Sequence, residues 1–116
     1  MSETCLFCGI SSGENPANIV YQDEMVTAFW DIKPIAPVHI LIIPNKHIHS
    51  LNEISEADGP ILAHMLFVAR DLAKEHGVDE DGYRLMTNIG ENGRQTVFHL
   101  HLHLIGGRRL MGRIVS

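Results

Sequence analysis

Three histidines alternate with apolar residues in the stretch "QTVFHLHLHLIGG", near the carboxyl end of the chain. They are His99, His101 and His103. On an extended strand, successive side chains point to opposite faces, so this alternation predicts a strand with all three imidazoles on one face. The other face would carry an apolar row that packs into the core, formed by Phe98, Leu100, Leu102 and Leu104.

A row of imidazoles supports two kinds of chemistry, and the third alternative is a polar sheet face without chemistry. Neutral imidazoles are common zinc ligands, and two of them at positions i and i+2 can converge on one ion. An imidazole nitrogen can also attack phosphorus and carry a covalent intermediate, while its neighbours bind phosphate oxygens or move protons. Nearby Asn88, Gln95 and Thr96 carry amide or hydroxyl donors, which suit phosphate better than zinc. The surroundings therefore favour phosphorus chemistry centred on His101.

The composition limits the remaining classes of protein. A chain of 116 residues with 45% hydrophobic content is expected to form a single domain over residues 1–116. A net charge of −5 argues against nucleic acid as a partner, because backbone phosphates are bound by clustered lysine and arginine. The longest apolar run, "HILIIP", is too short to cross a membrane, and "MSETCLFCGI" lacks the features of a signal peptide. We expect a cytoplasmic protein.

The apolar periodicity predicts strands followed by a helix and then further strands. From Ser55 onward, apolar residues recur every three or four positions, which predicts an amphipathic helix with Pro60 in its first turn and Gly77 at its end. His64 and His76 lie on this helix without polar companions and are interpreted as structural. Strands are expected at 19–21, 25–31, 39–43, 83–88 and across the histidines. This order predicts an α+β fold with an antiparallel sheet.

At this point the chain resembles a known family. "HLHLHLI" matches the histidine triad pattern, and "VYQDEMVTAFWDIKPIAPVHILIIP" and "EDGYRLMTNIGENGRQTVFHLHLHLIGGR" resemble the Hint branch of the histidine triad (HIT) superfamily, close to its bacterial members. The similarity covers about residues 5–110. It implies a five-stranded antiparallel sheet with one long helix and a short N-terminal helix, the sheet being extended across a homodimer.

The resemblance also implies an activity. Hint-like proteins are purine nucleoside phosphoramidases, or nucleotidyl hydrolases, which cleave the P–N bond of adenosine or guanosine 5′-monophosphoramidates through a nucleotidyl-histidine. The partner would then be a purine nucleotide such as AMP or GMP, and no cofactor is required for catalysis. Two alternatives remain: a dinucleoside polyphosphate hydrolase of the Fhit-like type, and a non-catalytic nucleotide-binding interaction protein.

By match to the family motif, His101 would be the nucleophile within the triad. His103 and Gln95 would hold the α-phosphate, with Thr96 near the leaving group. Many relatives carry two glycines before this glutamine, whereas this chain has Arg94 in the second place, beside the phosphate or the leaving group or facing solvent.

The other implied site residues lie earlier in the chain. Asn88 would contact the phosphate or the ribose, Asp31 would bind the ribose hydroxyls, and Ile32 would line the base pocket. His39 would support the hydrogen bonds of the triad from behind. Asp31, Asn88 and His39 also have ordinary structural alternatives, as a turn or cap residue, the start of a hairpin and a core histidine respectively.

The "CLFC" stretch places Cys5 and Cys8 at the spacing of half a zinc site. Some bacterial relatives complete such a site with the histidine after "IPNK", here His47, and the first triad histidine, His99, which implies a structural zinc. His49 is an alternative ligand to His47. Otherwise the two cysteines would pack as small hydrophobic residues.

Overall fold

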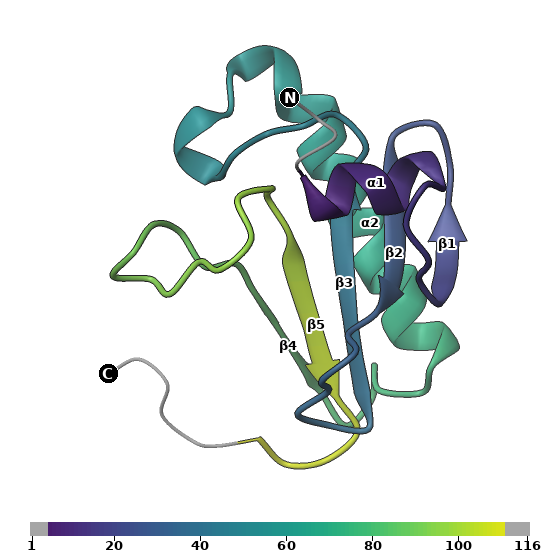
Figure 1. Cartoon of the computed structure of the whole chain (residues 1–116). Helices are drawn as coiled ribbons and strands as arrows, with labels where there is room; N and C mark the ends of the chain where they lie inside the picture. Colours follow the sequence, from purple (N-terminus) through teal and green to yellow (C-terminus); the bar gives the residue numbers. More distant parts are fainter. Residues whose placement is uncertain (1–4, 111–116) are drawn as a thin grey trace.

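A computed structural model describes residues 5–110, and these form one antiparallel sheet with a helix against each face (Figure 1). The strand order is β1-β2-β3-β5-β4. The strands are β1 (Ile19–Gln22), β2 (Val26–Trp30), β3 (Val38–Pro44), β4 (Tyr83–Met86) and β5 (Leu102–Gly106). The α+β class and the five-stranded sheet predicted from the sequence are confirmed.

The central strand β3 is buried along its whole length, because both faces of the sheet are covered. Ile40 and Ile42 pack into the larger core beneath helix α2 (Gly59–Glu75). Leu41 and Ile43 pack into the smaller core beneath helix α1 (Leu6–Ser12). A strand covered on both faces is apolar at consecutive positions, and "VHILIIP" has this pattern with one exception, His39.

Helix α2 begins and ends where its sequence predicts. Ser55 and Asp58 form a capping box just before it, and Pro60 lies in the first turn, where its missing N–H has no intrahelical partner to lose. Gly77 follows the helix at a φ of 75°, the left-handed conformation that commonly terminates helices. The buried face of the helix consists of Met65, Val68, Ala69, Leu72 and Ala73. No helix within residues 5–110 is long and apolar enough to span a bilayer.

The predicted histidine strand is shorter than expected. β5 begins only at Leu102, so two of the three triad histidines precede the sheet ladder. The backbone there leaves the sheet because the Leu100 N–H donates to the Ile48 carbonyl (2.7 Å) instead of to a neighbouring strand. Leu100 and Leu104 are buried as predicted. The expectation that Phe98 is buried is wrong: its side chain is 53% exposed.

The sequence interpretation that His64 has no polar companion is also wrong. Its Nε2 lies 2.6 Å from Oδ2 of Asp23, which caps the β1–β2 turn. The other oxygen, Oδ1, accepts the backbone N–H groups of Met25 and Val26, and the Tyr21 hydroxyl donates to Oδ2. Asp23 therefore ties the hairpin to helix α2.

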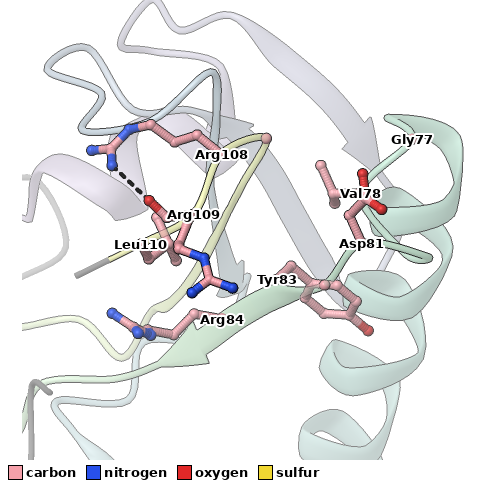
Figure 2. A pocket seen from close by; sticks show the side chains of 10 residues that line it. Gly77, Val78, Asp81, Tyr83, Arg84, Arg108, Arg109 and Leu110 are labelled. Carbon is pink, nitrogen blue, oxygen red and sulfur yellow. Dashed lines mark hydrogen bonds between the residues drawn. The ribbon is translucent and has the colours of Figure 1, made fainter. Parts of the chain in front are cut away.

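A cavity of about 620 Å³ lies at the far end of β5, between the segment after α2 and the segment after the strand (Figure 2). Arg84, Arg108 and Arg109 line one side of it, and Arg108 donates to the carbonyl oxygens of Ile35 and Arg109. None of the described residues that line this cavity is a histidine, so it is separate from the triad chemistry.

The Asp23 carboxylate predicts a pH-dependent contribution to stability. Partial burial opposes its ionised form, but hydrogen bonds from Tyr21, His64 and the turn backbone outweigh burial and hold its pKa well below the usual range. A carboxyl whose pKa is lower in the folded state stabilises the fold above its unfolded pKa and loses this effect as pH falls. We expect Asp23→Asn to lower the free energy of unfolding at pH 7 by about 1–2 kcal/mol.

Urea denaturation at pH 7 and at pH 3 checks this expectation. The difference between Asp23→Asn and the wild-type protein should shrink below about pH 4, where the unfolded carboxyl is protonated. Asp71→Asn is the control, because its pair with Arg70 is exposed and should contribute less than about 1 kcal/mol. An equal loss at both pH values would contradict the role given to the Asp23 charge.

Candidate active site

A cavity of about 400 Å³ opens between helix α1, the end of β2 and the 88–97 loop. Its apolar wall comes from α1 and the strands, and includes Leu6, Phe7, Ile10, Phe29, Trp30 and Leu41. Its polar lining is Asp31, Asn88, Arg94, Thr96, His101 and His103. The fold thus brings together at one cavity Asp31 and the polar residues of the 88–103 segment, which are distant in sequence and which the sequence analysis had singled out.

His101 is held in a defined tautomer. Its Nδ1 lies 2.7 Å from the backbone carbonyl oxygen of His99, and a carbonyl only accepts, so Nδ1 carries the proton. Nε2 is then the nitrogen with the free lone pair. Burial lowers the pKa of His101, and the bond to the His99 carbonyl opposes this shift only in part. A neutral imidazole with a fixed lone pair is the form that a nucleophile requires.

His39 and His103 form a second directed contact beside the first. Nδ1 of His39 accepts the backbone N–H of Ile35 (3.2 Å), so the His39 proton is on Nε2. That nitrogen lies 3.0 Å from Nδ1 of His103 and 3.4 Å from Oδ2 of Asp31. His103 therefore accepts at Nδ1 and carries its own proton on Nε2.

This arrangement leaves His103 as a neutral hydrogen-bond donor. Burial, with the neighbouring His101 and His39 rings, lowers the pKa of His103 to about 4. The ligand atoms of Asp31, His39 and His103 lie within 4.8 Å of one another, which is close enough for a metal ion. Because Nε2 of His39 holds a proton that is directed at His103, His39 is a hydrogen-bond donor in this group rather than a free metal ligand.

Asp31 and Ile32 lie at the mouth of the cavity, just after β2. The Asp31 carboxylate accepts the backbone N–H of Lys33 at Oδ1 (2.7 Å), so it also has the turn role that the sequence left open. Its other oxygen remains on the cavity side near His39. Ile32 is among the residues that line the cavity, but its side chain is 91% exposed.

The 88–97 loop forms the opposite rim, and one residue there differs from its expected position. Asn88 and Thr96 line the cavity, and the Asn88 amide also donates to the Gly93 carbonyl (2.7 Å). Gln95 does not line it, although the resemblance placed it on the phosphate. Its buried side chain accepts the Gly90 N–H (3.0 Å) and donates to the His49 carbonyl (2.8 Å), so it holds the loop in shape.

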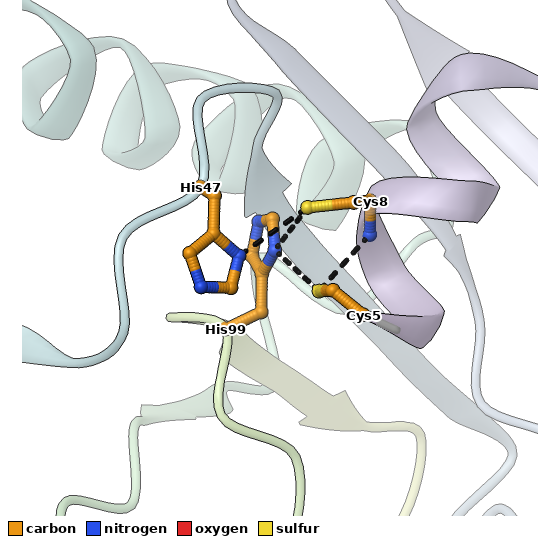
Figure 3. Close-up of side chains that lie close together, drawn as sticks. All are labelled: Cys5, Cys8, His47 and His99. Atoms are coloured by element: carbon orange, nitrogen blue, oxygen red, sulfur yellow. Dashed lines mark hydrogen bonds between the residues drawn. The ribbon is translucent and has the colours of Figure 1, made fainter. Parts of the chain in front are cut away.

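Four side chains that could together hold a metal ion lie close to one another, namely Cys5, Cys8, His47 and His99 (Figure 3). Sγ of Cys5 lies 3.2 Å from Nδ1 of His99, and Sγ of Cys8 lies 3.3 Å from Nδ1 of His47 and 3.5 Å from Nδ1 of His99. His49 is not part of this cluster; it stacks on Phe98 with ring centroids 5.0 Å apart. The geometry therefore selects His47 from the two alternatives.

His99 faces this cluster rather than the cavity. Its Nε2–H donates to the Pro44 carbonyl (2.8 Å), which leaves the Nδ1 lone pair directed at the two cysteines. Burial lowers the pKa of His99 to about 4, so this ring is neutral. Such a second hydrogen bond is typical of histidines that bind metals.

The apolar wall supplied by helix α1 was not predicted as part of the site. Phe7 packs edge-on against His101, with ring centroids 5.1 Å apart, and against Phe29 at 5.4 Å. The signal in the sequence was the apolar Leu6 and Phe7 between the cysteines. Once those cysteines are placed beside His99, the residues between them must lie near the triad.

The comparisons with known proteins agree with this geometry. Residues 4–113 match the family described as "Scavenger mRNA decapping enzyme C-term binding". The chain is 49% identical over 110 residues to the purine nucleoside phosphoramidase of Escherichia coli K12, covering 95% of this chain and 92% of that protein. It is also 50% identical over 105 residues to an uncharacterised HIT-like protein of Buchnera aphidicola, covering 90% of this chain and 94% of the relative.

Solved structures show the same fold. A HIT family hydrolase from Legionella pneumophila is 48% identical with a TM-score of 0.92, covering 94% of this chain and 97% of that one. A histidine triad protein from Clostridium difficile is 43% identical with a TM-score of 0.91, covering 94% and 95%. Sequence, fold and the arrangement of His101 and His103 lead to one conclusion: this chain belongs to the histidine triad (HIT) family.

Proposed function

We propose that this protein hydrolyses the P–N bond of purine nucleoside 5′-monophosphoramidates through a nucleotidylated His101. The observation that carries the proposal is the fixed tautomer of His101. Its Nδ1–H is bonded to the His99 carbonyl, so the Nε2 lone pair is available beside a cavity of about 400 Å³. The purine nucleoside phosphoramidase of E. coli, at 49% identity, supports the same activity.

Different parts of the cavity lining suit different parts of the substrate. The apolar wall of Phe29, Ile10 and Leu41 suits a purine base, and Asp31 at the mouth suits the ribose hydroxyls. The phosphate would then lie over His101 and His103, where their ring nitrogens meet it. Holding both ends of the nucleotide aligns phosphorus with Nε2 and lowers the entropic cost of the attack.

The reaction proceeds in two displacements at phosphorus. Nε2 of His101 forms a bond to phosphorus while the P–N bond breaks, and the departing amine takes up a proton from the pocket donors or water. Water then attacks the same phosphorus and gives up a proton, the His101–phosphorus bond breaks, and the nucleoside monophosphate leaves. The N–H that His103 directs to the cavity stabilises the phosphate oxygens as charge grows on them.

The cluster of Cys5, Cys8, His47 and His99 fits a structural zinc ion. Zinc with two sulfur and two nitrogen ligands at about 2.0–2.3 Å has tetrahedral edges of about 3.3–3.8 Å. The three contacts within the cluster, at 3.2, 3.3 and 3.5 Å, lie close to this range. A bound zinc would fasten helix α1 to the triad segment, and catalysis at His101 needs no metal.

We also propose that two copies join their sheets through β4. This strand is an edge of the sheet, and an edge strand has unpaired backbone groups that another strand can bind. Leu85, near its middle, is 36% exposed. A cytoplasmic location and the lack of a nucleic-acid partner stay predictions from composition.

Replacing the nucleophile should abolish turnover and spare binding. We expect His101→Asn to reduce hydrolysis of adenosine 5′-phosphoramidate by at least about 10³-fold. AMP affinity, measured by calorimetry, should change by less than about tenfold, or about 1.4 kcal/mol. His103→Asn is the matched control, since it removes a phosphate donor and should leave measurable activity.

Mass spectrometry of the wild-type protein, quenched without acid during turnover, should show a nucleotidyl adduct on His101. An adduct on His99 or His103 would contradict the assignment. Diadenosine polyphosphate, tested in parallel, separates the Fhit-like alternative, and AMP binding without hydrolysis of either compound would favour the non-catalytic one.

The metal site makes a prediction that distinguishes two neighbouring histidines. The purified protein should hold about one zinc per chain, and His47→Ala should lose most of it because three ligands hold the ion more weakly than four. His49→Ala should keep the metal, since His49 lies outside the cluster. Metal analysis after dialysis measures both. Equal zinc loss in the two variants, or none in either, would contradict the ligand set.

Sedimentation tests the dimer. At micromolar concentration the protein should sediment at twice its chain mass of 13.0 kDa. Leu85→Asp places a charge on the proposed joining strand and should shift the population to the monomer. Leu66→Asp, at an exposed position on α2, is the control and should remain dimeric. Only a 13 kDa species in the wild-type protein would overturn the proposal.

A further inference from the structure

Arg94 has a backbone conformation that a side chain of its kind rarely adopts. Its φ is 64°, and among residues 5–110 it is the only residue other than glycine with a positive φ. The left-handed region is costly for residues with a Cβ and open to glycine. Strained backbone of this kind is concentrated at functional sites. Its presence at the rim of the cavity suggests that the arginine side chain serves a purpose there.

The loop around Arg94 is built to hold this conformation. The Arg94 N–H donates to the Glu91 carbonyl and the Gln95 N–H to the Gly90 carbonyl, both at 3.0 Å. The buried Gln95 side chain then bonds to the Gly90 N–H and to the His49 carbonyl. These hydrogen bonds fix the turn on both sides of Arg94. The left-handed conformation of Arg94 therefore belongs to an ordered loop.

The guanidinium group has no partner within the described part of the chain. None of the hydrogen bonds or ion pairs among residues 5–110 involves the Arg94 side chain, and the residue is exposed. Arg94 lines the active-site cavity of about 400 Å³. It also lines an adjoining hollow of about 520 Å³, together with Glu91, Thr96 and Phe98. Among the residues of the described chain, 5–110, that line the cavity of about 400 Å³, Arg94 is the one permanent cation.

The hollow lies on the side of the cavity where the leaving group of the substrate would be. Helix α1 and strand β2 lie on one side of β5, and the 88–97 loop lies on the other (Figure 1). His101 and His103 line the same cavity as residues of α1, β2 and this loop. With the nucleoside against the α1 wall and phosphorus over the histidines, the amine that leaves phosphorus extends toward Arg94 and the hollow beyond it.

We propose that Arg94 is a specificity-determining residue that binds a carboxylate on the amine leaving group, so that the preferred substrates are nucleoside phosphoramidates of amino acids. This inference rests on the proposed phosphoramidase function. A guanidinium offers paired N–H donors that match a carboxylate, and an arginine without a partner is free to make this contact.

Within the described part of the chain, Glu91 is the one carboxylate on the same hollow, and it opposes an anion there. It lines only the outer hollow, whereas Arg94 lines both spaces. The carboxylate of an amino acid joined to phosphorus through its nitrogen lies close to the phosphate, and it therefore meets Arg94 before Glu91.

Two substrates that differ in one charge test this proposal. They are the adenosine 5′-phosphoramidates of glycine and of glycinamide, and the measured quantity is the ratio of their kcat/KM values. We expect this ratio to fall about tenfold in Arg94→Gly and in Arg94→Met, and by less in Arg94→Lys, which keeps the charge without the paired donors. Because glycine accepts a φ of 64°, the melting temperature of Arg94→Gly should not fall, which excludes a collapsed loop.

Glu91→Gln is the matched control, since it changes the charge of the same turn by one unit in the opposite direction. A ratio that is unchanged in Arg94→Gly overturns the proposal, as does a ratio that rises in Glu91→Gln as much as it falls in Arg94→Gly. If the wild-type protein hydrolyses neither compound, the proposed function is wrong. In that case calorimetry measures the affinities of the intact glycine and glycinamide compounds. The ratio of these two affinities, compared between the wild-type protein and Arg94→Gly, then decides whether Arg94 binds the carboxylate.

Discussion

The hydrogen bond from Nδ1–H of His101 to the carbonyl oxygen of His99 is the contact on which the site depends. It fixes the ring orientation and the tautomer of His101 together, so the reactive lone pair has one direction. The carbonyl is held in turn because the side chain of the same residue is fixed. Nε2–H of His99 bonds to Pro44 at the end of β3, and Nδ1 faces the cysteines of the N-terminal segment. One residue thus joins the central strand, helix α1 and the nucleophile.

The register of the central strand β3 explains how His39 reaches the triad. Leu41 of β3 lies opposite His103 in the antiparallel register, so His39, two residues away on the same face, is its diagonal neighbour. Side chains at diagonal positions are far enough apart for both imidazole rings to fit on this face of the sheet, with a hydrogen bond from His39 to His103. A buried polar residue in an otherwise apolar strand must be hydrogen-bonded, and His39 satisfies this through Ile35 and His103. The hydrogen bonds that offset the free-energy cost of burying His39 therefore also orient His103 of the triad.

Local patterns in the sequence predicted the sheet, the long helix and most residues that line the cavity, because these depend on periodicity and turn residues. The positions of Phe98, Gln95 and His64 could not be predicted in this way. Phe98 stacks on His49 and Gln95 donates to the His49 carbonyl, so both depend on a residue distant in sequence. His64 finds Asp23 only after α2 packs on the hairpin. A family motif gives the residue types of a site, but it does not say which side chain holds the loop and which faces the substrate.

The charges around the cavity suggest why the nucleophile is bonded to a carbonyl rather than to a carboxylate. In the proposed reaction, His101 begins neutral and becomes cationic when Nε2 bonds to phosphorus. Its Nδ1–H bond then becomes a charge-assisted bond, which is stronger than the neutral one. The stabilisation therefore grows as the reaction proceeds, which is the condition for an interaction to lower the barrier rather than only to tighten binding. A carboxylate in the same position would favour a protonated imidazole in the resting protein, and a protonated Nε2 has no lone pair for the attack. Burial lowers the pKa of His101 and the bond to the backbone carbonyl opposes this shift only in part, so the ring stays neutral until phosphorus arrives.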